Sequence, residues 1–144
     1  MNIGIIGSGG REHSLCFKLL QSKKVGEIFC IPGNAGTSKI CKNLDLDISN
    51  FDKLYRSIKK NDIKLIIVGP EIPLVQGITD FLEKKNIKVF GPDKKASQLE
   101  GSKIFMKNLC KKFNIPAAKY VEINDIQSAN EALKNFKEPI VVKS

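Results

Sequence analysis

The stretch Asn2-Ile-Gly-Ile-Ile-Gly-Ser-Gly-Gly-Arg-Glu-His13 decides the fold of this chain. Its first five residues are rich in isoleucine, which favours a short buried strand. The glycines that follow predict a tight turn, and residues 12–20 carry leucines at helical spacing. A strand, a glycine-rich loop and a helix in this order predict the first half of a βαβ unit.

The same alternation of strands and helices continues to about residue 90. Each expected strand is a short apolar run, and each expected helix has apolar residues three or four positions apart. This order predicts an α/β fold with an open, parallel, Rossmann-like sheet. The expected strands are residues 2–6, 27–31, 64–68 and 87–90, and the expected helices are residues 12–20, 51–58 and 74–84.

Four loops that contain glycine or proline follow the expected strands. In a parallel sheet with right-handed crossovers, these loops lie at one edge. Ligands of open α/β sheets bind at that edge, beyond the carboxyl ends of the strands. The candidate ligand loops are therefore Gly7–Arg11, Pro32–Thr37, Gly69–Pro73 and Gly91–Asp93.

The pattern changes near Gly101, where we place a domain boundary. Ser97 and Glu100 have capping-box spacing, and Ser102 stands where it can cap a new helix. Residues 1–101 then form an N-terminal α/β substrate-binding domain, and residues 102–144 form the beginning of a second one. In that second segment we expect helices at 103–113 and 126–136 and strands at 118–123 and 139–143.

The chain is basic, with 24 Lys and Arg against 15 Asp and Glu and a formal net charge of +9. Of these cations 22 are lysine and 2 are arginine, and the lysines are dispersed along the sequence. Base readout and tight phosphate contacts favour arginine. We therefore interpret most of the charge as a solvated surface and expect no nucleic-acid partner.

Membrane and metal functions are disfavoured as well. No apolar run reaches the ~18 residues of a membrane span, and the N-terminus does not resemble a signal peptide. We therefore expect a cytoplasmic protein with no membrane partner. The four cysteines form no C-x-x-C pair and the chain has one histidine, so we expect free thiols and no metal site.

The first loop, Gly7-Ser-Gly-Gly-Arg11, is a candidate phosphate site. Glycines let the backbone approach a ligand, and the N-terminus of a helix attracts an anion. Because Arg11 opposes the helix dipole, its position indicates an anion beside it. A dinucleotide fingerprint would need a third glycine where Glu12 stands, and no Gly-Lys-Ser/Thr Walker sequence follows. A plain strand-to-helix turn is the alternative.

Two further loops offer polar groups. Asn34, Gly36 and Thr37 present an amide, a backbone N–H and a hydroxyl, although an ordinary turn uses the same residue types. Glu71, between two prolines, offers a rigid carboxylate for sugar hydroxyls or an amine, although a glutamate at a helix start gains from the dipole alone. His13 has no identifiable partner, so we assign no catalytic residue.

Taken in order, these motifs resemble those of the phosphoribosylamine–glycine ligases, a family of ATP-grasp enzymes in purine biosynthesis. The resemblance covers all 144 residues, and the ordered set is far more specific than any one motif. It rests on Gly7-Ser-Gly-Gly-Arg-Glu-His13, Pro32-Gly-Asn-Ala-Gly-Thr37, Gly69-Pro-Glu-Ile-Pro-Leu74, Phe90-Gly-Pro92, Ala96 to Glu100 and Gly101-Ser-Lys-Ile-Phe-Met-Lys107.

The resemblance implies a reaction. ATP phosphorylates the glycine carboxylate, which gives an acyl phosphate and ADP, and the amine of 5-phosphoribosylamine then displaces phosphate to form glycinamide ribonucleotide. The family is much longer than this chain, so residues 102–144 would be the truncated start of its ATP-grasp domain. We therefore expect ATP and Mg²⁺ as cofactors, with the magnesium and glycine ligands beyond residue 144, and a monomer.

The resemblance also implies roles for individual residues. Gly7, Gly9, Gly10 and Arg11 would cradle the sugar 5-phosphate. Asn34, Gly36 and Thr37 would line the same pocket, and Glu71 would contact the ribose or its amine. Lys103 and Lys143, which composition alone would assign to the surface, would face the ATP phosphates.

Two alternatives stay open. One is a sugar-phosphate or nucleotide-binding module without catalysis, since the 144 residues alone are expected to be inactive. The other is a sibling ATP-grasp ligase with a different acceptor, which the His13 and Pro32–Thr37 motifs disfavour.

Overall fold

The computed structural model describes residues 1–136 and 140–142. It divides into two compact units, Met1–Ser97 and Gln98–Ser144. The structural division falls close to Gly101, the boundary predicted from the sequence.

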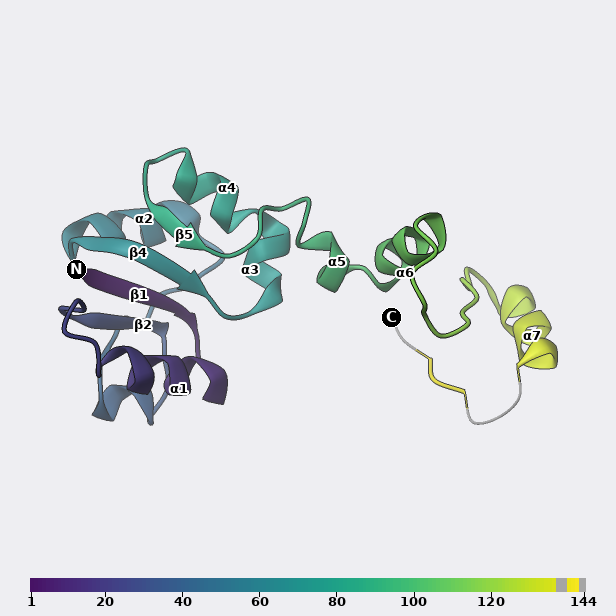
Figure 1. Ribbon diagram of the computed structural model, residues 1–144, viewed down its shortest axis with the longest axis horizontal. Coiled ribbons are helices and arrows are strands. Elements are labelled where there is room, and N and C mark those ends of the chain that lie inside the picture. Colours follow the sequence, from purple (N-terminus) through teal and green to yellow (C-terminus); the bar gives the residue numbers. More distant parts are fainter. Residues whose placement is uncertain (137–139, 143–144) are drawn as a thin grey trace. The chain divides into compact units, whose positions relative to one another are not determined.

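The first unit is built on a five-stranded parallel sheet of order β3-β2-β1-β4-β5 (Figure 1). The predicted α/β fold with an open parallel sheet is confirmed. The edge strand β3 was not predicted, because two residues are too few to show a period. The strands are β1 (Asn2–Gly7), β2 (Ile28–Pro32), β3 (Lys42–Asn43), β4 (Ile63–Val68) and β5 (Lys88–Phe90).

Helices lie on both faces of this sheet (Figure 1). On one face α1 (Gly10–Leu19) packs through Cys16 against Ile3 and Ile5 of β1 and their neighbours on β2. On the other face α2 (Phe51–Lys60), α3 (Glu71–Gln76) and α4 (Ile78–Glu83) bury a larger core around Ile6 and Ile66. Because successive strand residues point to opposite faces, strands buried on both sides are apolar throughout.

The segment predicted as one helix over 74–84 forms two helices, α3 and α4, which meet at Gly77. Gly77 adopts a left-handed backbone conformation with φ +97°. Its N–H donates to the carbonyls of Pro73 and Leu74, which ends α3. A glycine permits this conformation without strain, and apolar periodicity alone does not reveal the break.

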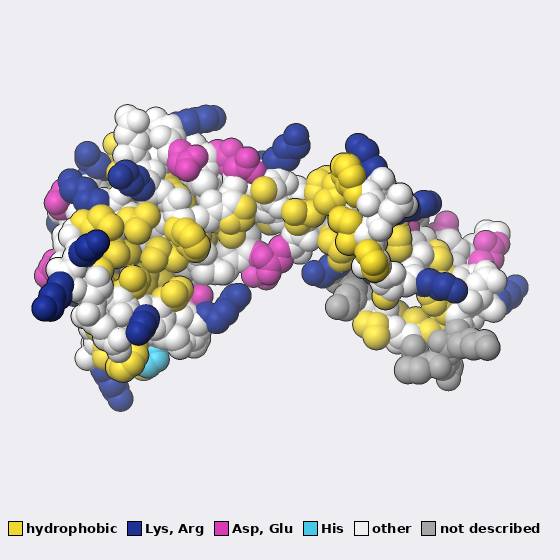
Figure 2. Space-filling model, viewed as in Figure 1, with side chains coloured by type: hydrophobic (Ala, Val, Ile, Leu, Met, Phe, Trp, Pro, Cys, Tyr) yellow, Lys and Arg dark blue, Asp and Glu magenta, His cyan; other side chains and the backbone are white. Residues whose placement is uncertain are grey.

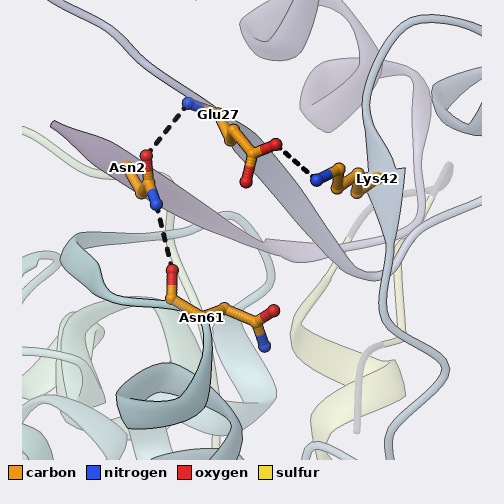
Figure 3. Close-up of polar contacts among 4 residues, drawn as sticks. All are labelled: Asn2, Glu27, Lys42 and Asn61. Atoms are coloured by element: carbon orange, nitrogen blue, oxygen red, sulfur yellow. Dashed lines mark hydrogen bonds and ion pairs between the residues drawn. The ribbon is translucent and has the colours of Figure 1, made fainter.

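Polar side chains tie the elements together at the amino edge of the sheet (Figure 3). Asn2 Oδ1 accepts a hydrogen bond from the Glu27 N–H (3.1 Å), and Asn2 Nδ2 donates to the Asn61 carbonyl (3.0 Å). Glu27 also pairs with Lys42 at the start of β3. These contacts fix the ends of the strands opposite the predicted ligand edge.

The face that carries α1 is only partly covered. Leu65 and Ile67 of β4 are half-buried, and Phe90 of β5 is 72% exposed on the same face. Figure 2 shows hydrophobic side chains gathered over these strands, with Lys and Arg side chains dispersed around them. On the face in view, the cations therefore form no single patch.

The second unit is helical in the part that the structure describes. Its helices are α5 (Gln98–Gly101), α6 (Lys103–Lys112) and α7 (Ile126–Asn135). Ser102 caps α6 as predicted, with its Oγ accepting from the Phe105 N–H (3.2 Å). Ser97 instead donates to the Asp93 carbonyl (2.6 Å), so its hydroxyl closes the preceding turn.

The strand predicted at 118–123 is wrong, because these residues are irregular. A strand needs a hydrogen-bonded neighbour, and the described residues of this unit contain none. Of the strand predicted at 139–143, residues 139 and 143 lie outside the described residues, and residues 140–142 are not in a strand. Among the helices described, none is long and apolar enough to cross a membrane.

Candidate functional site

A cleft of about 510 Å³ opens at the carboxyl ends of β1, β2 and β4. The loops after these strands and the segment that precedes α2 form its walls. The predicted site residues Gly7 and Gly9 line it, and the others in this unit lie on the adjoining loops and helices. The lining residues are Gly7, Ser8, Gly9, Glu12, Pro32, Leu46, Asp47, Ile48 and Pro70.

Glu12 is a buried carboxylate in the wall of this cleft, and its side chain is only 4% exposed. Its Oε2 accepts a hydrogen bond from the Gly9 N–H (2.6 Å), which caps the start of α1. A methyl group added at Gly7, Gly9 or Gly69 would collide with the Glu12 side chain. The glycines that end β1 and β4 therefore make room for Glu12 as well as for a ligand.

This arrangement changes what the glycine loop can offer to an anion. The Gly9 N–H is already engaged by Glu12. The N–H groups of Gly10 and Arg11 lie in the first turn of α1, where no helical carbonyl accepts from them. The Arg11 side chain is exposed and forms no ion pair with any residue that the structure describes. Gly10 and Arg11 adjoin the cleft without lining it, and their contact with a phosphate stays a prediction.

The ends of β1 and β2 are joined by their loops. Gly7 has φ +130° and Gly33 has φ +78°, both in the region that favours glycine. The Gly33 N–H donates to the Gly7 carbonyl (3.1 Å). These two positions explain why glycine stands at the end of each strand.

Asn34 and Thr37 hold the second loop in shape. Asn34 Oδ1 accepts from the N–H groups of Gly36 (2.7 Å) and Thr37 (2.9 Å), and its Nδ2 donates to the Ser8 carbonyl (2.7 Å). The buried Thr37 hydroxyl lies within hydrogen-bonding distance of two acceptors, the Asn34 carbonyl and Asn43 Oδ1. These side chains shape the pocket by fixing the loop, and their direct contact with a ligand stays a prediction.

Glu71 and His13 lie beside the cleft. Glu71 is the first residue of α3, and its side chain is exposed after Pro70, which lines the cleft. The His13 ring lies close to Gly36, 3.6 Å from the position that a Cβ would take there. His13 thus packs against the second loop, in keeping with a supporting role.

The two predicted ATP-facing lysines belong to the second unit. Lys103 is the first residue of α6 and is exposed. Lys143 lies outside the described residues. No group of three His, Cys, Asp or Glu side chains among the residues described is placed to hold a metal ion.

A second carboxylate, Asp47, lines the cleft from the segment that precedes α2. The Ser49 hydroxyl (2.7 Å) and the Ser49 N–H (2.9 Å) both donate to Asp47 Oδ1. These hydrogen bonds lower the pKa of Asp47, because they stabilise its charged form. Two carboxylates therefore line the cleft, the buried Glu12 and the exposed Asp47, and Arg11 is exposed in the adjoining first turn of α1.

Sequence reasoning missed Glu12 and Asp47 as cleft residues. The signal for Glu12 was its position three residues after Gly9, the N3 position of a capping box. Asp47 lies in the loop between the two-residue strand β3 and α2. No local sequence pattern there indicates a cleft residue. Only the folded sheet brings both carboxylates to the end of β1.

The fold places this chain in the class of ATP-grasp proteins. A solved phosphoribosylamine–glycine ligase from Thermotoga maritima matches with a TM-score of 0.68 at 29% identity, over 95% of this chain and 31% of that structure. An N5-carboxyaminoimidazole ribonucleotide synthetase from Thermus thermophilus matches with a TM-score of 0.68 over 95% of this chain and 37% of that one. At 18% identity, this second likeness shows the fold alone.

Within that class, the chain belongs to the phosphoribosylglycinamide synthetase family. Residues 1–100 match the family model "Phosphoribosylglycinamide synthetase, N domain", and residues 101–144 match the model of the ATP-grasp (A) domain. A phosphoribosylamine–glycine ligase from Clostridium acetobutylicum is 44% identical over 144 residues, which is 100% of this chain and 35% of that protein. The chain thus spans about a third of the length of the curated relatives it matches.

Proposed function

We propose that the whole protein joins glycine to 5-phosphoribosylamine while ATP is converted to ADP and phosphate. In this proposal the first unit holds the phosphosugar, and the second unit begins the ATP site. The observation that carries it is the match of residues 1–100 to the N domain of this family, with a cleft at the edge where open α/β sheets take ligands. Monomeric state and a cytoplasmic location stay predictions.

The proposed reaction makes clear demands on the protein. Glycine's carboxylate attacks the γ-phosphorus of ATP, and the resulting acyl phosphate then reacts with the sugar's amine, with release of phosphate. The site must therefore hold amine and acyl phosphate in reach of each other and exclude water. The amine-bearing partner would bind in the cleft.

The proposed contacts follow the charges around the cleft. Gly10 and Arg11 would meet the 5-phosphate, with Gly7 and Gly9 giving the backbone its close approach. The loop that contains Asn34, Gly36 and Thr37 would close one side, and Glu71 would accept from the ribose or its amine. Lys103 and Lys143 would balance ATP phosphate charge. As the resemblance implies, the magnesium ligands would lie beyond residue 144.

The direct test is ADP release by the whole protein, with phosphoribosylamine generated during the assay. We expect release only when glycine and phosphoribosylamine are both present. Arg11→Ala should raise the KM for the phosphosugar about tenfold or more, because a charge-assisted contact is lost. Arg56→Ala is the matched control, since Arg56 is an exposed arginine on α2, outside the glycine loop. Equal effects of both substitutions would contradict the phosphate assignment.

The second candidate, a binding module without catalysis, differs in one outcome. It predicts that the 144-residue chain gains thermal stability with ribose 5-phosphate while the whole protein shows no glycine-dependent ADP release. The ordered family motifs favour the ligase.

A further inference from the structure

Glu12 has a carboxylate oxygen that the fold leaves without a partner. Oε2 accepts from the Gly9 N–H (2.6 Å), whereas Oε1 is buried and has no hydrogen-bond partner among the described residues. A buried acceptor without a donor is costly, and such groups are rare in folded proteins. This oxygen therefore calls for a donor that the protein itself does not provide.

The surroundings of Oε1 explain why no backbone group satisfies it. The end of β4 lies beside it, because a Cβ added at Gly69 would collide with Oε1. The Gly69 N–H is directed to the Ile6 carbonyl (3.0 Å), and Pro70 has no N–H to offer. Glu12 lines the cleft, so the missing donor can come from a molecule bound there.

Packing also fixes the position of this carboxylate. Gly7, Gly9 and Gly69 border the side chain so closely that a methyl group on any of them would overlap it. The hydrogen bond to Gly9 sets the orientation of the carboxylate plane. Oε1 is thus held in place before a ligand arrives, which lowers the entropic cost of binding.

We propose that Glu12 is a ligand-binding residue, and that its Oε1 accepts a hydrogen bond from a hydroxyl or the C1 amine of the bound phosphosugar. This inference rests on the proposed function and assigns an orientation to its substrate. The phosphate faces Gly10 and Arg11, and the donor-bearing end of the sugar faces Glu12. The opposite orientation would bring a phosphate against a buried carboxylate.

The test is Glu12→Gln in the 144-residue chain, with binding of ribose 5-phosphate measured by calorimetry. In this variant the amide oxygen can still accept from the Gly9 N–H. The amide NH₂ then stands where Oε1 stands in the wild type, so a hydrogen-bond donor replaces an acceptor. Ribose 5-phosphate carries a C1 hydroxyl where the substrate carries its amine. We expect its affinity to fall about tenfold.

Inorganic phosphate separates this role from a purely electrostatic one. Removing the negative charge of Glu12 should leave the affinity for inorganic phosphate unchanged or raise it, so only the affinity for ribose 5-phosphate should fall. Glu83→Gln changes the same charge on the exposed end of α4 and should alter neither affinity. Thermal melting of each variant checks that the fold is retained.

The outcomes are distinct. If wild type binds ribose 5-phosphate and Glu12→Gln binds it equally well, a water or nothing satisfies Oε1, and this inference is overturned while the proposed function stands. A parallel loss of affinity for both probes would also overturn it, because it would indicate a structural role. If wild type does not bind ribose 5-phosphate, the proposed phosphosugar site and this inference fail together.

Discussion

At the scale of single residues, the glycines of the first loop make room both for a ligand and for the Glu12 side chain. The sequence predicts only the first of these. The loop was predicted from its glycines, from Arg11 and from its position after a strand. The role of Glu12 was not, because it depends on Gly69, which is distant in sequence and reaches Glu12 only when β1 and β4 pair. Local patterns reveal the loop, and tertiary contacts decide which of its N–H groups are free.

Because Gly69 leaves space for Glu12, alanine substitutions at Gly69 and at Gly10 should differ in their effect on stability. Gly69→Ala should lower the free energy of unfolding by about 1–3 kcal/mol, because the new methyl group overlaps the Glu12 carboxylate. Gly10→Ala meets no atom within 4 Å and lies in a helix, so it should be neutral or slightly stabilising. Urea denaturation of both variants compares them. A neutral Gly69→Ala would show that Glu12 moves freely.

The buried thiols predict a graded chemical reactivity. The four cysteines are free, and Cys16 and Cys30 are fully buried in the core between α1 and the sheet. Burial raises the pKa of both thiols. At pH 8 to 9 the reactive thiolate is therefore scarcer at these two residues than in an ordinary cysteine.

Iodoacetamide at pH 8 should therefore label the half-buried Cys110 well before Cys16 and Cys30. The difference should persist as the pH is raised to 9 and disappear in urea. Mass spectrometry of the alkylated peptides gives the order. Early labelling of Cys16 would mean that α1 opens readily from the sheet.

At the scale of elements, the sheet and its helices were predictable where the pattern was long. The parallel sheet and the predicted ligand edge both follow from apolar runs that end in glycine or proline. The break at Gly77 and the two-residue β3 were missed, because each depends on a turn conformation or a pairing that periodicity does not record. The strand predicted at 118–123 failed for the opposite reason, since a suitable sequence does not form a strand without a neighbour.

Replacing Asn34 should loosen the second loop and leave the sheet unchanged. Asn34→Ala removes the acceptor for the Gly36 and Thr37 N–H groups and the tie to the Ser8 carbonyl. Hydrogen exchange at Gly36 and Thr37 should accelerate about tenfold or more, while amides inside β1 keep their protection. Exchange followed by NMR measures each amide.

Asn34→Asp is the matched control. It keeps the Oδ1 acceptor and loses only the donor to Ser8. The Gly36 and Thr37 amides should then stay protected. If both variants exchange alike, the loop is held mainly by its tie to Ser8.

At the scale of the whole molecule, the buried apolar core belongs to the first unit. Among the described residues, Ala132 is the one buried apolar side chain of the second unit. The first unit contains two clusters, one on each face of the sheet. Cooperative stability should therefore come from the first unit, since apolar burial is the main stabilising contribution to folding.

A chain that ends at Gly101 should consequently unfold in urea with nearly the same midpoint as the 144-residue chain. Circular dichroism follows the transition in both. A chain of 101 residues that loses its cooperative transition would show that residues 102–144 help to build the fold of the first unit.

The central claim is that the cleft at the end of β1 binds a phosphosugar, and amide chemical shifts test it most directly. Ribose 5-phosphate should shift the amides of Ser8 and Asp47, which line the cleft, and those of Gly10 and Arg11 in the adjoining first turn of α1. Ribose without phosphate should shift none of them. A separate depression near Leu20, Ile28 and Lys42 serves as an internal control and should stay unchanged. No shifts at the cleft, or shifts confined to that second depression, would contradict the account.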